Sequence, residues 1–294
     1  MTTRRACCYC GAEGEAAEHA AVASNVRRWG GRRFGVWRCG ACGSIHAAEE
    51  ADLDDIYCGY PFQNQKLGYA LRRCYGVLLR RLRRAGLDRD DSVLDYGCGS
   101  GHLVRHLRQS GYARAAGYDA YTPGWDAPDA LAGRYAWVLA QDLIEHAEAP
   151  VDMLRTLGEL AQPGGRVVIG APNAAGIDLR RPGRDRHSLH QPYHRHIPSR
   201  RALVAASERL GWRLERFWRT PYTNTPHPFL NTRFLLHYFR CFDDTVDVAF
   251  EASAPLTGRL ATPATLILGF LGALGCPPTE MQAIFRTPEA GEAS

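Results

Sequence analysis

The stretch "VLDYGCGSGHL", residues 93–103, decides the fold that the sequence predicts. An apolar run ends at an aspartate, and three glycines, a cysteine and a serine follow within five residues of the loop. Glycine inside a regular element costs about 0.5–1 kcal/mol relative to alanine, so this segment needs a tight turn or a close backbone approach. Strand, glycine loop and helix in this order cradle nucleotides, because the helix N-terminus offers unpaired N–H groups.

An acidic residue at the end of the next predicted strand supports a nucleotide site. Asp119 closes the strand pattern "ARAAGYD", 18 residues after Gly101. An acid at about this interval hydrogen-bonds ribose hydroxyls. The glycine spacing differs from that of a dinucleotide fingerprint, and the Lys-Ser/Thr pair of a P-loop does not follow. The pattern therefore favours a nucleoside ligand of another kind.

Strand and helix patterns alternate from Ser92 onward. Alternation of this kind indicates parallel pairing, so we predict an α/β fold with a doubly wound, mostly parallel, Rossmann-like sheet. Ser199 is the expected N-cap of its helix. The predicted strands are 92–96, 113–119, 135–141, 166–173, 212–220 and 279–287, and the predicted helices are 101–111, 149–165 and 199–211, with an amphipathic helix within 65–86.

Composition is that of an ordinary globular protein, with 45% hydrophobic and 23% charged residues. The net charge of +5 comes almost entirely from arginine, since Lys66 is the only lysine. The most apolar window, residues 264–275, is shorter than the roughly 20 residues of a membrane span. We interpret it as buried core and expect no membrane association. The N-terminal sequence has no apolar leader, so we expect a cytoplasmic protein.

Cysteine pairs near the N-terminus predict a metal site. Cys7 and Cys10 form one Cys-x-x-Cys-Gly unit, and Cys39 and Cys42 form a second. Two such turns hold zinc tetrahedrally through four sulfur ligands at about 2.3 Å. A fully ligated zinc is structural rather than catalytic. Cys8 is an alternative to Cys7, but Cys7 has the two-residue spacing.

Four segments together resemble class I S-adenosylmethionine-dependent methyltransferases. "VLDYGCGSG" is similar to their first motif and "GYDAY" to their second. "YAWVLAQDLIEHAEAPVDML" and "LAQPGGRVVIGAPN" resemble two later motifs. The resemblance runs from about Ser92 to Arg219. It implies a methyltransferase that uses S-adenosylmethionine, with a zinc-ribbon-like module in front.

The resemblance also implies roles for particular residues. Asp119 would hold the ribose hydroxyls, and Gln141 and Asp142 would lie over the cofactor near its methyl group, with Leu143 facing adenine or substrate. The methionine and ribose side would be lined by Asp95, Gly97, Gly99 and Gly101.

One departure from the family affects the adenine contact. The family usually has a further strand after the second motif, but only fifteen residues separate Asp119 from Tyr135. We expect a loop and one helical turn there. Trp125 or Asp126 would then supply the adenine contact.

Histidines are the candidates for a catalytic base, because imidazole exchanges protons near neutral pH. His146 follows a predicted strand on the cofactor side, although such a residue can instead stabilise its loop. His190 and His194 precede the helix at Ser199, where similar enzymes place a substrate loop. Together with His196 they could also bind a metal.

The sequence leaves the methyl acceptor open between two classes. Zinc-ribbon methyltransferases of this kind resemble enzymes that act on small molecules, namely sugars or natural-product intermediates. The alternative is a ribosomal- or transfer-RNA base methyltransferase, which would hold RNA with the zinc module and the arginine-rich helix. A non-catalytic binding protein is a third hypothesis, against which the intact glycine loop argues. The sequence does not define the oligomeric state.

We divide the chain into a zinc-ribbon-like module at 1–60, a helical connector at 61–90 and a methyltransferase domain at 91–294. Two long segments interrupt the strand and helix pattern, at 174–198 and at 220–277. Segments of this length inside a sheet fold are typically lids or substrate elements. Several aromatic and polar residues of the second insertion could line a substrate pocket, or could equally stabilise an insertion that packs on itself. They are Tyr222, Asn224, His227, Asn231 and Arg233.

Overall fold

The computed structural model describes residues 5–14, 16–50, 52–57, 59–251, 260 and 262–291. Its centre is a six-stranded sheet in the order β11-β12-β9-β8-β6-β7. The strands are β6 (Val93–Tyr96), β7 (Ala115–Tyr118), β8 (Tyr135–Gln141), β9 (Ala161–Pro172), β11 (Arg213–Thr220) and β12 (Glu280–Arg286).

Four of these strands pair in parallel and two do not. β7, β6, β8 and β9 form the parallel part, whereas β12 pairs antiparallel with both β9 and β11. The predicted mostly parallel, Rossmann-like α/β sheet is confirmed. All six predicted strands are present. β8, β9 and β12 are apolar runs buried within the sheet, whereas the edge strand β11 alternates apolar and charged residues and is partly exposed.

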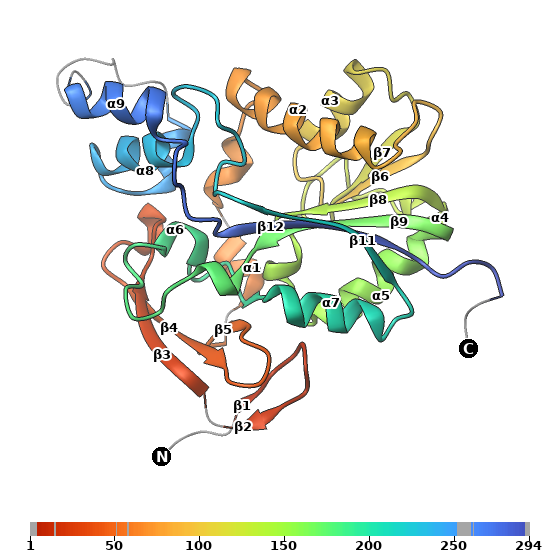
Figure 1. Ribbon diagram of the computed structural model, residues 1–294, viewed down its shortest axis with the longest axis horizontal. Helices are drawn as coiled ribbons and strands as arrows, with labels where there is room; N and C mark the ends of the chain where they lie inside the picture. The colour runs from red at the N-terminus through yellow and green to blue at the C-terminus, as the bar shows by residue number, and fades with distance from the viewer. Residues whose placement is uncertain are drawn as a thin grey trace.

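Helices cover both faces of the sheet (Figure 1). On one face lie α2 (Tyr69–Arg84) and α3 (His102–Gln109), and on the other lie α5 (Pro150–Leu160) and α7 (Arg200–Glu208). Neighbouring residues of a strand point to opposite faces, so both faces must be apolar. In β8, Trp137 and Leu139 pack against α2 and α3, while Val138 and Ala140 pack in the opposite core.

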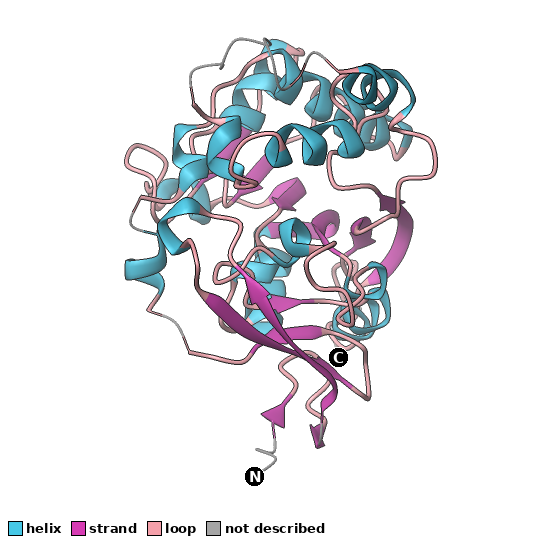
Figure 2. Ribbon diagram, turned by 90° about the vertical axis from the view of Figure 1, so that its left-hand side faces the viewer, coloured by secondary structure: helices cyan, strands magenta, loops and turns pink. Residues whose placement is uncertain are grey.

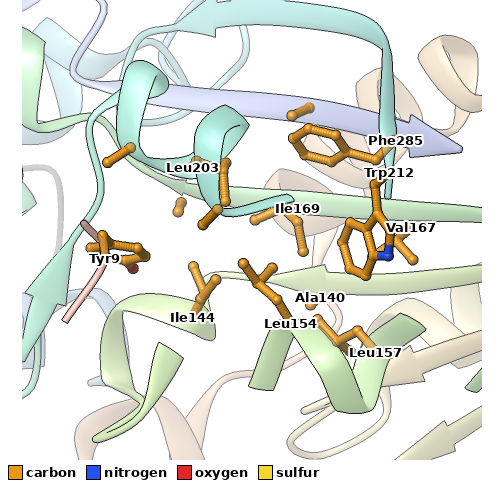
Figure 3. Packing of buried hydrophobic residues seen from close by; sticks show 14 of the residues in the cluster. Tyr9, Ala140, Ile144, Leu154, Leu157, Val167, Ile169, Leu203, Trp212 and Phe285 are labelled. Carbon is orange, nitrogen blue, oxygen red and sulfur yellow. The ribbon is translucent and has the colours of Figure 1, made fainter. Parts of the chain in front are cut away.

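The core between the sheet and α5 and α7 reaches the N-terminal segment (Figure 3). Leu154 and Leu157 of α5 are fully buried there, and truncating one buried leucine to alanine typically costs about 2–5 kcal/mol. Tyr9 lies at the end of this core beside Ile144 and Leu203. The N-terminal segment therefore shares the main core.

A second sheet is formed mainly by the N-terminal segment and has the order β10-β5-β4-β3 (Figure 2). Its strands are β3 (Ala16–Ala23), β4 (Arg33–Cys39), β5 (Ile45–Ala47) and β10 (His196–Ile197), and a two-stranded ribbon of β1 (Arg5–Ala6) and β2 (Glu13–Gly14) precedes them. The strand β10 comes from the first long interruption. The domain boundaries drawn from the sequence stay a prediction. The boundary at residue 60 is crossed by the pairing of β10 with β5 and by the packing of Tyr9 in the main core.

Two sequence-based expectations about helices need correction. The helix expected at 149–165 ends at Leu160, because Pro163 and Gly164 lie within the start of β9 rather than at the end of the helix. The segment 264–275 is not buried core. It contributes to α9 (Pro263–Leu271), whose Leu266, Ile267, Phe270 and Leu271 are 56–60% exposed. A helix that is apolar on all sides can bury only the side that meets its neighbour, here α8 (Thr232–Arg240).

The remaining elements are short. In place of the family's additional strand the structure has α4 (Asp129–Ala132), one helical turn as expected, so β7 lies at the edge of the sheet.

None of the helices in the described part of the chain has the length and apolarity needed to cross a bilayer. The other short elements are α1 (Leu53–Tyr57), α6 (Arg186–Leu189) and the 3₁₀ helices η1 (Arg27–Trp29), η2 (Pro61–Asn64), η3 (Ile144–His146), η4 (Ala174–Gly176) and η5 (Val246–Ala249).

Candidate functional site

The glycine loop between β6 and α3 is covered closely by two side chains. Gly97 and Gly101 both have positive φ, +78° and +69°, where residues with a Cβ are strained. A Cβ at Gly97 would lie 2.6 Å from Leu143, and one at Gly101 would lie 1.9 Å from Trp125. Both positions therefore require glycine. The structure places the Trp125 side chain on the glycine loop beside Gly101. Trp125 is one of the two residues for which we predicted the adenine contact.

Asp119 links the glycine loop to the end of β7. Its Oδ2 accepts a hydrogen bond from the Gly99 N–H at 2.8 Å, and its Oδ1 accepts one from the Tyr121 N–H at 3.0 Å. A carboxylate oxygen can accept two hydrogen bonds, so each oxygen keeps capacity for a hydroxyl. The side chain is half-buried. This geometry fits the predicted ribose contact.

Asp95 lies beneath the loop and is buried. Burial raises its pKa to about 7, and the nearby negative charge of Asp119 adds to this shift. The free protein therefore holds this carboxyl partly protonated near neutral pH. A positively charged group placed beside it would favour the ionised form.

The end of β8 separates two residues that we expected to act together. Gln141 lies on the sheet, where its Oε1 accepts a hydrogen bond from Gln282 at 3.1 Å, and Gln282 in turn accepts one from Arg81. Asp142 has a left-handed backbone with φ of +51°, and its side chain is exposed. Their expected position over the transferable methyl stays a prediction.

The three histidines singled out as candidate bases lie in one cluster. His146 and His194 have ring centroids 4.7 Å apart in an edge-to-face arrangement, and His190 lies 5.0 Å from His194. Tyr57 and Tyr60 of the N-terminal segment reach this histidine cluster. The Tyr57 hydroxyl is 2.7 Å from His146 Nδ1, and the Tyr60 hydroxyl is 3.2 Å from His190 Nε2.

Burial keeps the histidine cluster neutral. It lowers the pKa of His146 to about 4 and moves the pKa values of His190 and His194 well below the ordinary range. His196 does not join the cluster and instead faces His46 of β5. A neutral imidazole can accept a hydrogen bond or a proton. With a pKa of about 4, however, His146 is a weaker base than the free imidazole from which we predicted its role.

Glu145 is a functional candidate that the sequence analysis missed. It is fully buried, and neither carboxylate oxygen has a hydrogen-bond partner among the residues that the structure describes. Its Oε1 lies 3.8 Å from His194 Nε2. Burial raises its pKa well above the ordinary value, and Asp142 and Glu280 contribute in the same direction. The available signal was its place beside His146 in the quoted methyltransferase motif.

Three clusters of described residues have the donor atoms to hold a metal, and two of them lie at the histidine cluster and at the predicted zinc ligands. Glu145, His146 and His194 offer three donor atoms within 4.8 Å of one another. Cys7, Cys10, Cys39 and Cys42 offer four within the same limit.

The four cysteines fit tetrahedral zinc. Cys7 and Cys42 have sulfur atoms 3.5 Å apart, and Cys10 and Cys39 have theirs 3.7 Å apart. Four sulfur ligands at about 2.3 Å from a tetrahedral zinc would be roughly 3.8 Å from one another. The structure uses Cys7 rather than Cys8 in this set, as the spacing predicted.

The second cysteine turn docks on the central sheet through α7. Ser199 caps this helix by accepting a hydrogen bond from the Ala202 N–H at 3.1 Å, which confirms the predicted cap. The same hydroxyl donates to the Cys42 carbonyl at 2.6 Å. The cysteine cluster is thus tied to the segment that follows the histidine cluster.

The sheet order, the covered glycine loop and Asp119 define the class of protein as an α/β methyltransferase with a Rossmann-like fold. The family model described as a methyltransferase domain matches residues 69–216. The chain belongs to this family and is a class I S-adenosylmethionine-dependent methyltransferase.

Solved structures with low sequence identity are similar to the chain. A chain of the Haloferax volcanii complex between the Trm112 methyltransferase activator and a methyltransferase is 15% identical. The match covers 82% of this chain and all of that one, with a TM-score of 0.48. The Burkholderia thailandensis 1,6-didemethyltoxoflavin N1-methyltransferase, bound to its substrate and S-adenosylhomocysteine, is 14% identical over 84% and 96% of the two chains (TM-score 0.44). None of the curated proteins matches the chain.

Proposed function

We propose that the protein transfers a methyl group from S-adenosylmethionine to a small molecule of the sugar or natural-product class. The observation that carries this proposal is the acidic edge of the sheet beside the histidine cluster. Asp142 and Glu145 follow β8, and Glu280 begins β12 opposite Pro172 at the end of β9. Carboxylates accept hydrogen bonds from hydroxyl and amino groups, which such small molecules carry.

The same edge disfavours RNA as the acceptor, because RNA binding depends on cationic contacts, whereas the side chains at this edge are carboxyl groups, and burial favours the neutral form of both glutamates by raising their pKa values. Two arginines of the N-terminal segment are engaged in ion pairs within the protein. Arg27 pairs with Asp243 and Glu251, and Arg28 pairs with Asp55. RNA binding would have to compete with these ion pairs.

The glycine loop and its two carboxylates fit the cofactor. When bound, S-adenosylmethionine supplies a methyl group made electrophilic by its sulfonium. Asp119 would accept hydrogen bonds from the ribose hydroxyls, and Asp95 would face the positively charged amino group of the methionine part. Gly97, Gly99 and Gly101 would allow the backbone to approach, while Leu143 and Trp125 exclude water from the loop.

His146 would accept the proton that the acceptor group loses. Its ring is neutral at pH 7, and the Tyr57 hydroxyl at its Nδ1 fixes the orientation of the ring. His194 packs edge-on against it and is held by a hydrogen bond of its Nδ1–H to the Ser188 carbonyl at 2.8 Å. Positioned bases contribute typically 10²–10⁴-fold to the rate, and a base with a pKa below the working pH belongs to the lower part of this range.

We also assign zinc to Cys7, Cys10, Cys39 and Cys42. Four thiolates leave no open position, so this zinc would be structural. It would fix two turns whose Tyr9 and Cys42 contact the main core and α7. Its role would be to hold the N-terminal segment, including Tyr57, on the methyltransferase sheet.

The proposed acceptor class is tested by methyl transfer from a labelled cofactor to two sets of acceptors at equal concentrations. One set contains nucleotide sugars, amino sugars and phenolic or amine natural products, and the other contains transfer RNA and ribosomal RNA lacking modifications. We expect incorporation in the first set and none in the second. Label in RNA that falls steeply with added salt would overturn the proposal and favour the RNA methyltransferase.

A further inference from the structure

A third group of metal-binding side chains lies beside the four cysteines, and no role assigned so far uses it. Cys8, His46 and His196 offer three donor atoms that lie within 4.8 Å of one another. We refer to these residues as the Cys8 triad. They come from the first cysteine turn, from β5 and from β10, so folding alone brings them together.

Strand pairing fixes the two histidines of the Cys8 triad. β10 pairs antiparallel with β5, and His196 is the direct partner of His46 in this register. Side chains of directly opposed residues lie on the same face of a sheet, about 5 Å apart at Cβ. Their Nδ1 atoms are 3.0 Å apart.

The distances within the Cys8 triad suit tetrahedral coordination. Cys8 Sγ lies 3.7 Å from His46 Nδ1. With ordinary zinc bond lengths, a sulfur and a nitrogen ligand are about 3.6 Å apart and two nitrogen ligands about 3.3 Å apart. The Cys8–His46 distance therefore agrees within about 0.1 Å. Widening the nitrogen–nitrogen distance from 3.0 Å to about 3.3 Å needs only a small ring movement.

Hydrogen bonding alone satisfies this group poorly. His46 Nε2 lies 3.3 Å from Cys7 Sγ, a ligand of the proposed structural zinc. If Nε2 carries the proton and donates it to that thiolate, Nδ1 keeps a single lone pair. Both Cys8 and His196 approach this one lone pair. A cation would bind the lone pairs of all three residues at once.

We propose that Cys8, His46 and His196 bind a second zinc ion beside the four-cysteine site, with its fourth position open to solvent. One thiolate and two imidazoles select zinc over magnesium or calcium, which take oxygen ligands. Three protein ligands and one open position differ from the closed structural site. Cys8 lines a surface pocket of about 500 Å³ together with Glu148 and Arg209, and this pocket would give water a route to the fourth position.

The second zinc would join the N-terminal segment to the segment that carries the histidine cluster. Cys8 and His46 belong to the first 60 residues, whereas His196 follows His194 by two residues. The Tyr9 hydroxyl donates a hydrogen bond to the His196 carbonyl at 3.0 Å and marks the same junction. The proposal rests on these contacts and not on the proposed methyl acceptor.

The metal content of the intact protein tests the proposal. The chain is purified under reducing conditions with zinc, passed through a desalting column and analysed by elemental mass spectrometry against protein concentration. We expect Cys8→Ala and His196→Ala each to contain one zinc ion fewer than the wild type, which holds at least two. Cobalt substitution gives a second readout, since each variant should lose the absorption of one cobalt site.

Two matched variants control for the loss of a cysteine or a histidine elsewhere. Both residues are half-buried, Cys74 with a hydrogen bond to the Thr223 carbonyl and His227 with one to the Pro228 carbonyl. Cys74→Ala and His227→Ala should keep the wild-type zinc content. A wild type with a single zinc ion, or a folded Cys8→Ala or His196→Ala variant with unchanged content, would overturn the proposal. If one of these variants fails to fold, the zinc content of the wild type and of the other variant decides whether the second zinc exists.

Discussion

The hydroxyl of Tyr57 lies 2.7 Å from Nδ1 of His146, although 89 positions separate the two residues. Tyr57 ends α1 in the N-terminal segment, and His146 ends η3 after β8. The N-terminal segment thus contributes directly to the histidine cluster. It acts as part of the candidate site as well as a fold-stabilising element.

Removing the Tyr57 hydroxyl should lower turnover without weakening cofactor binding. Tyr57→Phe loses the hydrogen bond that orients His146, and His146→Ala loses the ring itself. We expect kcat to fall by about 10²–10⁴-fold in His146→Ala and by less in Tyr57→Phe. Affinity for S-adenosylhomocysteine, measured by calorimetry, should remain at the wild-type value.

Tyr69→Phe is the matched control for this prediction, because Tyr69 is 62% exposed and its hydroxyl contacts only His227 among the described residues. It should retain wild-type kcat. Full activity of His146→Ala would remove this histidine from the mechanism.

Cofactor affinity should increase with pH up to about pH 7. Burial and Asp119 raise the pKa of Asp95 to about 7, whereas the positively charged amino group of the cofactor favours the ionised carboxylate. Below pH 7 binding must release a proton from Asp95, so affinity should fall by up to about tenfold per pH unit. Above this pH the dependence from Asp95 should disappear.

Asp95→Asn provides the comparison for the pH dependence. This variant should bind S-adenosylhomocysteine more weakly and with little change between pH 6 and pH 8. Calorimetry over this range measures both. If affinity changes with pH equally in the wild type and in Asp95→Asn, a group other than Asp95 causes the pH dependence.

Gly101→Ala should destabilise the protein more than Gly124→Ala does. Both glycines have positive φ, but a Cβ at Gly101 meets Trp125 whereas one at Gly124 meets nothing within 4 Å. Left-handed strain costs each variant about 1 kcal/mol or more, and overpacking should add about 1–3 kcal/mol at Gly101. Urea denaturation of the two variants measures this difference. If they are equally stable, Trp125 does not restrict the loop.

A zinc chelator should lower the melting temperature of the whole chain. Cys7, Tyr9 and Cys42 belong to the same core cluster as Leu154 and Leu203, so loosening the cysteine turns should weaken the main core as well. We expect one cooperative transition that shifts downward with chelator and returns on adding zinc. Differential scanning calorimetry measures it, and a transition unaffected by the chelator would contradict a structural zinc.

Local sequence patterns predicted the central sheet well. Most of its strands are apolar runs with a turn signal at the end, β11 shows alternation instead, and the glycine loop allows few alternatives after Asp95. Ser199 was recognisable as a cap because capping depends on residues three positions apart. These features depend on neighbours along the chain.

Contacts between distant segments were not predictable in the same way. Nothing near Glu145 in the sequence indicates that its carboxylate is buried without a partner. The pairing of His196 with His46 joins strands 150 residues apart, and the packing of α9 on one neighbour leaves Leu266 exposed. These properties come from tertiary packing, which periodicity does not specify.

The account depends most on cofactor binding at the glycine loop through Asp119. Calorimetric titration of S-adenosylhomocysteine into the wild type and into Asp119→Ala tests it most directly, with Asp90→Ala as the control, because Asp90 is exposed and precedes β6 at the end of the strand opposite the glycine loop. We predict saturable one-site binding by the wild type and Asp90→Ala, and at least a hundredfold weaker binding by Asp119→Ala with unchanged zinc content. No heat of binding with the wild type, or equal affinity in Asp119→Ala, would contradict it.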